Sequence, residues 1–140
     1  MKLNRIINKI CLCLFLMILY PLVSSAVDRQ SLKNGDIIFQ DLDCGPMCDA
    51  IEAVTNGYEG LDFSHMGMVY LRNDSVLIIE SIGKGVILTP LDQFLKRTAN
   101  KHLVARLKPK YTSLIPQALG YSLLCMGMPY DDDFLYDNGK

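Results

Sequence analysis

The sequence has no tryptophan, only two histidines, no internal repeat, no low-complexity tract and no long run of one charge sign. The missing repeats and biased tracts exclude a repeat architecture and leave one compact domain behind a separate N-terminus. Basic side chains are also scarce. The chain has 14 Lys and Arg against 15 Asp and Glu, and three of the basic residues (Lys2, Arg5 and Lys9) lie near its start. The remainder is acidic, which argues against a nucleic-acid or anionic-membrane partner.

The first 26 residues have the three-part pattern of a secretory signal peptide. Residues 1–9 carry basic but no acidic side chains, residues 10–23 (ICLCLFLMILYPLV) are apolar, and residues 24–26 (SSA) are small. The apolar stretch is shorter than the ~20 residues of a membrane span and contains a proline, and its two cysteines lie inside it rather than after it, unlike in a lipoprotein. We therefore expect a signal peptide over residues 1–26, and a periplasmic or extracellular domain over residues 27–140 without a transmembrane segment.

Three cysteines, Cys44, Cys48 and Cys125, remain after removal of the signal peptide. An odd number predicts one disulfide and one left-over thiol, or three thiols of which one has a function. Cys44 and Cys48 lie near a predicted helix N-terminus, which can activate a nucleophilic thiol, but a local disulfide or two buried thiols is favoured. Cys125 is interpreted as a small core residue. A zinc site built from Cys44, Cys48, His65 and His102 would lack a second close-spaced ligand pair, because the two histidines are far apart in the sequence. No metal or cofactor is therefore predicted.

Strand-like and helix-like periodicities alternate along the rest of the chain. Strands are predicted at residues 35–40, 65–71, 76–81, 85–89 and 103–108, and helices at residues 44–57, 89–98 and 113–127. Thr89 and Ser113 are the predicted N-caps of the last two helices, and the first of these has a proline at its first helical position. This mixed order predicts an α+β fold with a largely antiparallel sheet and flanking helices.

His65 and Glu80 are the candidate catalytic pair. A hairpin loop of two or four residues centred between Asn73 and Asp74 places His65 opposite Ile82 and makes Glu80 its diagonal neighbour on the same face, roughly 7 Å away between Cβ atoms. A carboxylate among apolar residues needs a partner. A histidine held in one tautomer and orientation by an acid is the working half of a nucleophile–base–orienter triad. The alternative is a structural histidine and a solvated strand end, and a three-residue loop would place the two side chains on opposite faces.

Four blocks in a fixed order carry a family resemblance: LKNGDIIFQ, FSHMGMVY, IIESIGKGVILTPLDQFLKR and GMPYDDDF, within residues 32–136. They resemble the permuted papain-like branch of the NlpC/P60 superfamily, close to the YiiX-like amidases or peptidases, with lecithin retinol acyltransferase as a distant relative. The resemblance implies a circularly permuted papain-like fold and a cysteine hydrolase acting on an amide or ester. It assigns the general base to His65 and the orienting acid to Glu80. Gln40, at the end of the first strand, is predicted to donate to the oxyanion or to shape the substrate cleft.

The resemblance also implies a nucleophile that no residue here matches. In the permuted order the cysteine comes last, in a Tyr-Cys-Ser-Glu-Leu-like segment after a Pro-Tyr-Asp block. Here PYDDDFLYDNGK runs to Lys140 without it. We therefore expect a C-terminally incomplete domain that is inactive by itself, whose family substrate is a cell-envelope peptide or a lipid amide or ester. The alternative is a noncatalytic remnant that binds a cell-envelope peptide, glycan or lipid through the same cleft.

Overall fold

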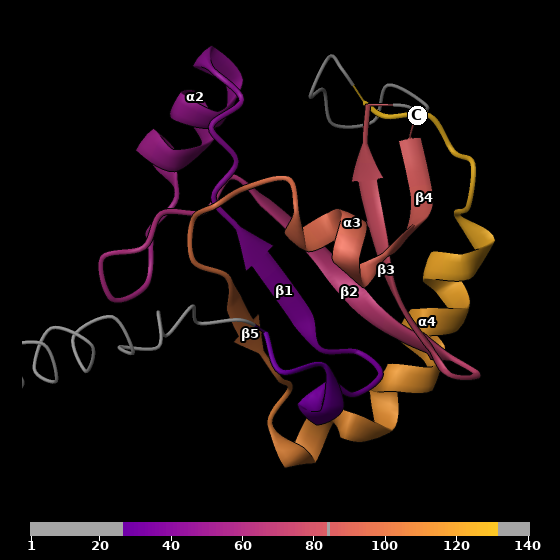
Figure 1. Ribbon diagram of the computed structural model, residues 1–140. Helices are drawn as coiled ribbons and strands as arrows, with labels where there is room; N and C mark the ends of the chain where they lie inside the picture. Colours follow the sequence, from indigo (N-terminus) through magenta and orange to yellow (C-terminus); the bar gives the residue numbers. More distant parts are fainter. Residues whose placement is uncertain (1–26, 84, 132–140) are drawn as a thin grey trace, which may run out of the picture.

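The computed structural model describes residues 27–83 and 85–131, so the predicted signal peptide lies outside the described residues. Five antiparallel strands form one sheet in the order β4-β3-β2-β1-β5 (Figure 1). No helix within these two ranges has the length and apolar character needed to cross a membrane. The strands are β1 (Ile37–Gln40), β2 (His65–Arg72), β3 (Ser75–Ile82), β4 (Gly85–Pro90) and β5 (Leu103–Ala105). The helices are η1 (Arg29–Ser31), α2 (Pro46–Val54), α3 (Leu91–Leu95), η2 (Pro109–Leu114) and α4 (Ile115–Leu124). The predicted α+β fold is confirmed.

The β2–β3 hairpin has the predicted register. Arg72 pairs with Ser75 and Val69 with Ile78, which leaves a two-residue turn at Asn73 and Asp74. Asn73 has a φ of 52°, a backbone conformation that asparagine tolerates better than most residues. Because the turn has an even number of residues, the side chains at positions 65 and 80 project to the same face of the hairpin.

Side chains alternate between two different faces of the sheet, as the two-residue period of a strand requires. On one face, Ile38, Val69 and Ile78 are fully buried in a core with Leu91 and Phe94 of α3. On the other face, side chains of β1 and β2 line a pocket together with residues of α4, the helix coloured yellow-orange in Figure 1. One face of the sheet is therefore buried beneath α3, and the other face opens into a pocket.

Gly67 allows α3 to approach β2 next to His65. A Cβ atom at position 67 would lie 2.2 Å from Ile78 Cγ2 and 3.1 Å from Phe94 Cε2. Such a Cβ would collide with Ile78 and press on the Phe94 ring. The glycine in the His-Met-Gly sequence is thus needed for the close packing of a phenylalanine whose ring centroid lies 5.8 Å from that of His65.

Both predicted helix caps are wrong. Thr89 lies in β4, and α3 begins at Leu91 without a side-chain cap, because the Thr89 hydroxyl donates to the Glu80 carboxylate instead. A hydrogen bond to a buried charge is stronger than one to an exposed helix end, which accounts for the difference. Ser113 lies within η2, so α4 begins later than predicted, at Ile115, and it ends at Leu124.

Candidate active site

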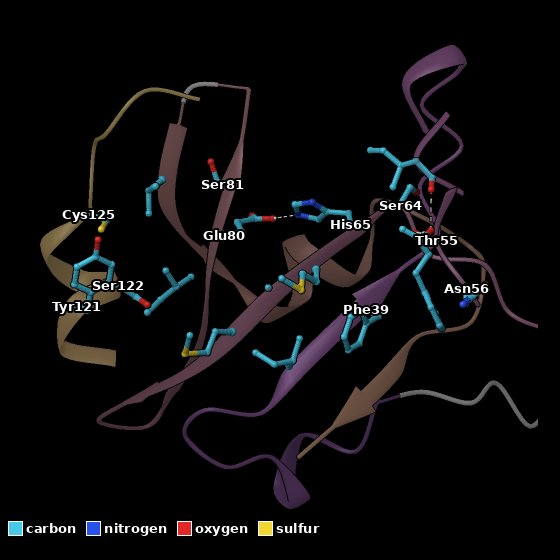
Figure 2. Close-up of a pocket in the computed structure, with 18 residues that line it drawn as sticks. Phe39, Thr55, Asn56, Ser64, His65, Glu80, Ser81, Tyr121, Ser122 and Cys125 are labelled. Carbon is cyan, nitrogen blue, oxygen red and sulfur yellow. Dashed lines mark hydrogen bonds and ion pairs between the residues drawn. The ribbon is translucent and has the colours of Figure 1, made fainter. Parts of the chain in front are cut away.

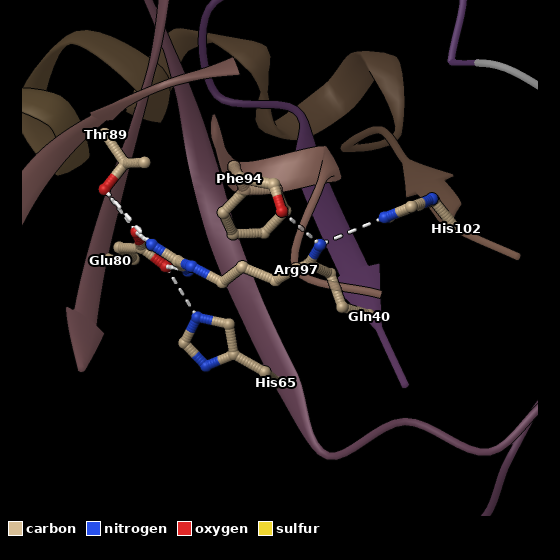
Figure 3. A network of polar contacts seen from close by, with 7 residues as sticks. All are labelled: Gln40, His65, Glu80, Thr89, Phe94, Arg97 and His102. Carbon is tan, nitrogen blue, oxygen red and sulfur yellow. Dashed lines mark hydrogen bonds and ion pairs between the residues drawn. The ribbon is translucent and has the colours of Figure 1, made fainter. Parts of the chain in front are cut away.

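His65 and Glu80 form the contact that their spacing predicts. His65 Nε2 lies 2.7 Å from Glu80 Oε2, at the end of the sheet where β2 begins and β3 ends (Figure 3). The His65 side chain is 13% exposed and that of Glu80 is fully buried. Since the carboxylate can only accept, Nε2 carries the proton and Nδ1 is the ring nitrogen that can accept one from a nucleophile. The predicted geometry is confirmed, and the catalytic roles of the two residues remain predictions.

Arg97 and Thr89 complete the surroundings of Glu80. The Arg97 guanidinium donates through Nη1 to Oε2 and through Nη2 to Oε1, and the Thr89 hydroxyl donates to Oε1 (Figure 3). The sequence analysis missed Arg97. One signal was available, because a buried carboxylate generally requires a cation, and an arginine follows the short helix α3.

The pKa of the Glu80 carboxyl reflects two opposing causes. Burial by itself raises this pKa, but hydrogen bonds from Arg97, His65 and Thr89, together with the positive charge of Arg97, lower it to about 2. Hydrogen bonds to the charged form and an opposite charge both favour the carboxylate. Glu80 is therefore an anion at neutral pH and can only accept from His65.

His65 and Glu80 are among the residues that line a pocket of about 860 Å³ (Figure 2), although their side chains project to the face of the hairpin that carries Val69 and Ile78. Its lining is mostly apolar and comes from β1, β2, β3, β4, α2, α4 and the segment between α2 and β2. The main apolar contributors are Ile37, Phe39, Ile51, Phe63, Met66, Met68, Ile79 and Val86, and the polar contributors, which include Ser64, Ser81, Tyr121 and Ser122, lie on different sides of the pocket (Figure 2). An apolar pocket with a few polar groups is the usual form of a small-molecule or acyl-group site.

The cysteines divide into a pair and a free thiol, as one of the two predicted patterns requires. Cys44 and Cys48 form a disulfide, with their Cα atoms 5.3 Å apart, so the local-disulfide alternative is confirmed and the nucleophile alternative is wrong for this pair. A disulfide sulfur is not a thiolate nucleophile. Cys125 is free and partly exposed, and it lines the pocket at the C-terminal end of α4. Its interpretation as a core residue is wrong, because the side chain is only partly buried and lines the pocket.

Gln40 is fully buried and lies outside the pocket lining. Its Nε2 donates to the Phe94 carbonyl oxygen at 2.8 Å and contacts His102 Nε2 at 3.0 Å (Figure 3). Burial lowers the pKa of His102, which favours the neutral ring that accepts this hydrogen bond. Both amide hydrogens of Gln40 thus have protein partners, and its predicted oxyanion role gains no support from this geometry.

The geometry agrees with the comparisons to known proteins. Residues 31–140 match the model of a family described as permuted papain-like amidase enzymes, YaeF/YiiX, C92 family. The chain belongs to this family. It is 31% identical over 127 residues to the uncharacterized protein YiiX of Escherichia coli strain K12. That alignment covers 89% of this chain and 60% of the curated relative's length. The predicted permuted papain-like resemblance is confirmed.

A solved structure supports the same fold. The crystal structure of yiiX from Escherichia coli O157:H7, described as a metalloprotein, matches with a TM-score of 0.57 and 30% identity. The match covers 71% of this chain and 53% of that one. Within residues 27–83 and 85–131 of the present chain, no group of three or more His, Cys, Asp or Glu side chains could hold a metal ion. These residues therefore do not fit a metal centre, and no step of the mechanism below depends on one.

Proposed function

We propose that this chain carries the base and the orienting acid of an exported cysteine amidase or peptidase. The observation that supports the proposal is the contact between His65 and Glu80, two residues that line an apolar pocket, in a member of the permuted papain-like amidase family. His65 Nδ1 takes the thiol proton, and the resulting thiolate attacks the carbonyl carbon of the substrate. The imidazolium then protonates the leaving amine or alcohol as the C–N or C–O bond breaks. Water, deprotonated by His65, hydrolyses the thioester and regenerates the thiol.

The nucleophile in this proposal is a cysteine that follows the Pro129-Tyr130-Asp131 block. Two observations argue against the cysteines of the described residues as the nucleophile. Cys44 and Cys48 are joined to each other, and Cys125 lies at the C-terminal end of a helix. The carbonyl end of a helix carries partial negative charge, which disfavours a thiolate.

The proposed substrate is a cell-envelope peptide or a lipid amide or ester. The lining of the pocket that includes His65 is largely apolar, which suits an acyl chain or an apolar side chain of the substrate. The few polar side chains of the lining, among them Ser64 and Ser81, suit hydrogen bonds to an amide or ester group.

The test compares the 140-residue chain with the same chain joined, after Asp131, to a segment that carries the Tyr-Cys-Ser-Glu-Leu-like sequence implied by the family resemblance. The probes are a peptide anilide and p-nitrophenyl esters of short and long fatty acids. We expect hydrolysis by the joined chain alone, blocked by iodoacetamide and retained in its Cys125→Ser variant. Turnover by the unjoined chain that disappears in Cys125→Ser would instead assign the nucleophile to Cys125. A joined chain that binds the probes without cleaving them would favour the noncatalytic binding function.

Export is part of the proposal and has its own test. Its supports are the three-part pattern of residues 1–26 and the disulfide between Cys44 and Cys48, a bond that forms and persists in oxidising compartments. We expect the protein purified from a bacterial host to begin near Val27 and to be recovered by osmotic shock or from the medium. Mass spectrometry of the intact protein checks this, and a chain that retains Met1 in washed membranes would contradict export.

A further inference from the structure

Arg97 interacts with the orienting acid more extensively than His65 does. The guanidinium contacts both oxygens of Glu80, and one of them, Oε2, is also the partner of His65 Nε2. Glu80 is fully buried, whereas the Arg97 side chain is 25% exposed. His65 therefore faces a carboxylate whose negative charge is matched at contact distance by a fixed positive charge.

Phe94 holds the arginine and the histidine in a fixed relation. The guanidinium carbon of Arg97 lies 5.5 Å from the centroid of the Phe94 ring, and the ring of His65 lies 5.8 Å from the same centroid. Phe94 is itself fully buried in the core that α3 closes. Because guanidinium groups bind aromatic faces and carboxylates with planar geometry, this packing leaves Arg97 little freedom to leave Glu80.

The other groups around His65 supply no comparable charge. Within the described part of the pocket lining, the further titratable side chains are Tyr121 of α4 and Cys125, which follows that helix. On the β1 side the neighbour is the neutral amide of Gln40, which contacts His102. Arg97 is thus the one cation among these neighbours of the His65–Glu80 pair.

We propose that Arg97 is a positioning residue that locks Glu80 in place and cancels its charge, so that Glu80 orients His65 without driving it into the imidazolium form. A lone buried carboxylate beside a histidine favours the protonated ring, which cannot accept a proton. A carboxylate paired with arginine keeps the hydrogen bond to Nε2, but it stabilises the second proton of the imidazolium less than a lone carboxylate does. The inference rests on the proposed function for its catalytic meaning, and its test uses the titration of His65 instead of hydrolysis.

The experiment is an NMR titration of the imidazole Cε1–H resonances in the purified chain. The sequence has two histidines, so a His102→Gln variant assigns both signals. In Arg97→Met and Arg97→Gln we expect the midpoint of the His65 titration to rise by about one pH unit or more, because the charge of Glu80 is no longer cancelled. Gln can still donate to Glu80, so this variant provides the test if the Met variant does not fold. Arg97→Lys keeps the charge and should return the midpoint toward that of the wild type.

The matched control is Arg106→Met. Arg106 donates to both oxygens of the buried Asp36 at 2.7 Å, so its loss removes an equivalent arginine–carboxylate pair away from His65. We expect this variant to lose stability but to keep the wild-type titration of His65. A His65 midpoint that stays unchanged in the folded Arg97→Met or Arg97→Gln protein would overturn the inference. That result would leave the proposed hydrolysis, which is assayed separately, still open to its own test.

Discussion

Replacement of His65 by alanine in the joined chain is expected to lower kcat/KM for the thiol-dependent hydrolysis by about 10²–10⁴-fold, the usual contribution of a general base. Among the described residues, His65 is the only histidine that both contacts Glu80 and lines the pocket, and alanine removes its ring. The loss should appear mainly in kcat, because the apolar lining that binds the substrate stays in place.

His102→Gln is the matched control for this experiment. His102 is the other histidine of the chain, and it contacts the buried Gln40 instead of lining the pocket. We expect its kcat/KM to stay within about threefold of the parent, a difference below 1 kcal/mol in transition-state free energy. Equal losses in the two variants, or full activity in His65→Ala, would contradict the assignment of the base.

Glu80 is expected to make the protein sensitive to acid. Its pKa is lowered from 4.5 to about 2 in the folded chain. A lowered pKa stabilises the folded state fully above the unfolded value of 4.5, and this stabilisation is lost as the pH falls through the folded value near 2. The difference corresponds to about 3 kcal/mol in the free energy of unfolding.

The measurement is urea unfolding of the wild type and Glu80→Gln from about pH 6 to about pH 2. Glutamine has the shape of the protonated acid, so the variant should be less stable at neutral pH, and the two proteins should converge as Glu80 protonates. Asp92→Asn serves as control, because Asp92 pairs with Arg29 at the surface with 68% of its side chain exposed. Such pairs contribute about 1 kcal/mol at most, so this variant should follow the wild type at every pH. A stability gap between wild type and Glu80→Gln that stays constant with pH would contradict the lowered pKa.

Local features of the sequence were sufficient to predict the hairpin and its catalytic pair. Asn73 and Asp74 form a two-residue turn, and the parity of that turn determines which side chains share a face. His65 and Glu80 therefore share a face, within reach of each other, once the hairpin forms. The ordered sequence blocks likewise predicted the family, since they extend along most of the matched residues 31–140.

The sequence pattern was a weaker guide to helix ends and single cysteines. Thr89 has the residue type and spacing of an N-cap, yet its hydroxyl donates to Glu80, a partner nine residues earlier in the chain. Cys125 follows the apolar stripe of a helix, yet its side chain is only partly buried and lines the pocket. At Thr89, a capping preference worth about 1 kcal/mol yielded to a tertiary contact.

By itself, the sequence determined the α+β class, the register of the β2–β3 hairpin and the pairing of His65 with Glu80, because these depend on periodicity and on one short turn. The tertiary structure alone decided that Arg97 neutralises Glu80, that the amide nitrogen of Gln40 contacts Phe94 and His102, and that Cys125 lines the pocket. Each of these contacts joins residues from elements that meet only when α3, α4 and the loop before β5 fold against the sheet. Strand periodicity states which face a residue occupies, but it does not state which distant side chain will cover that face.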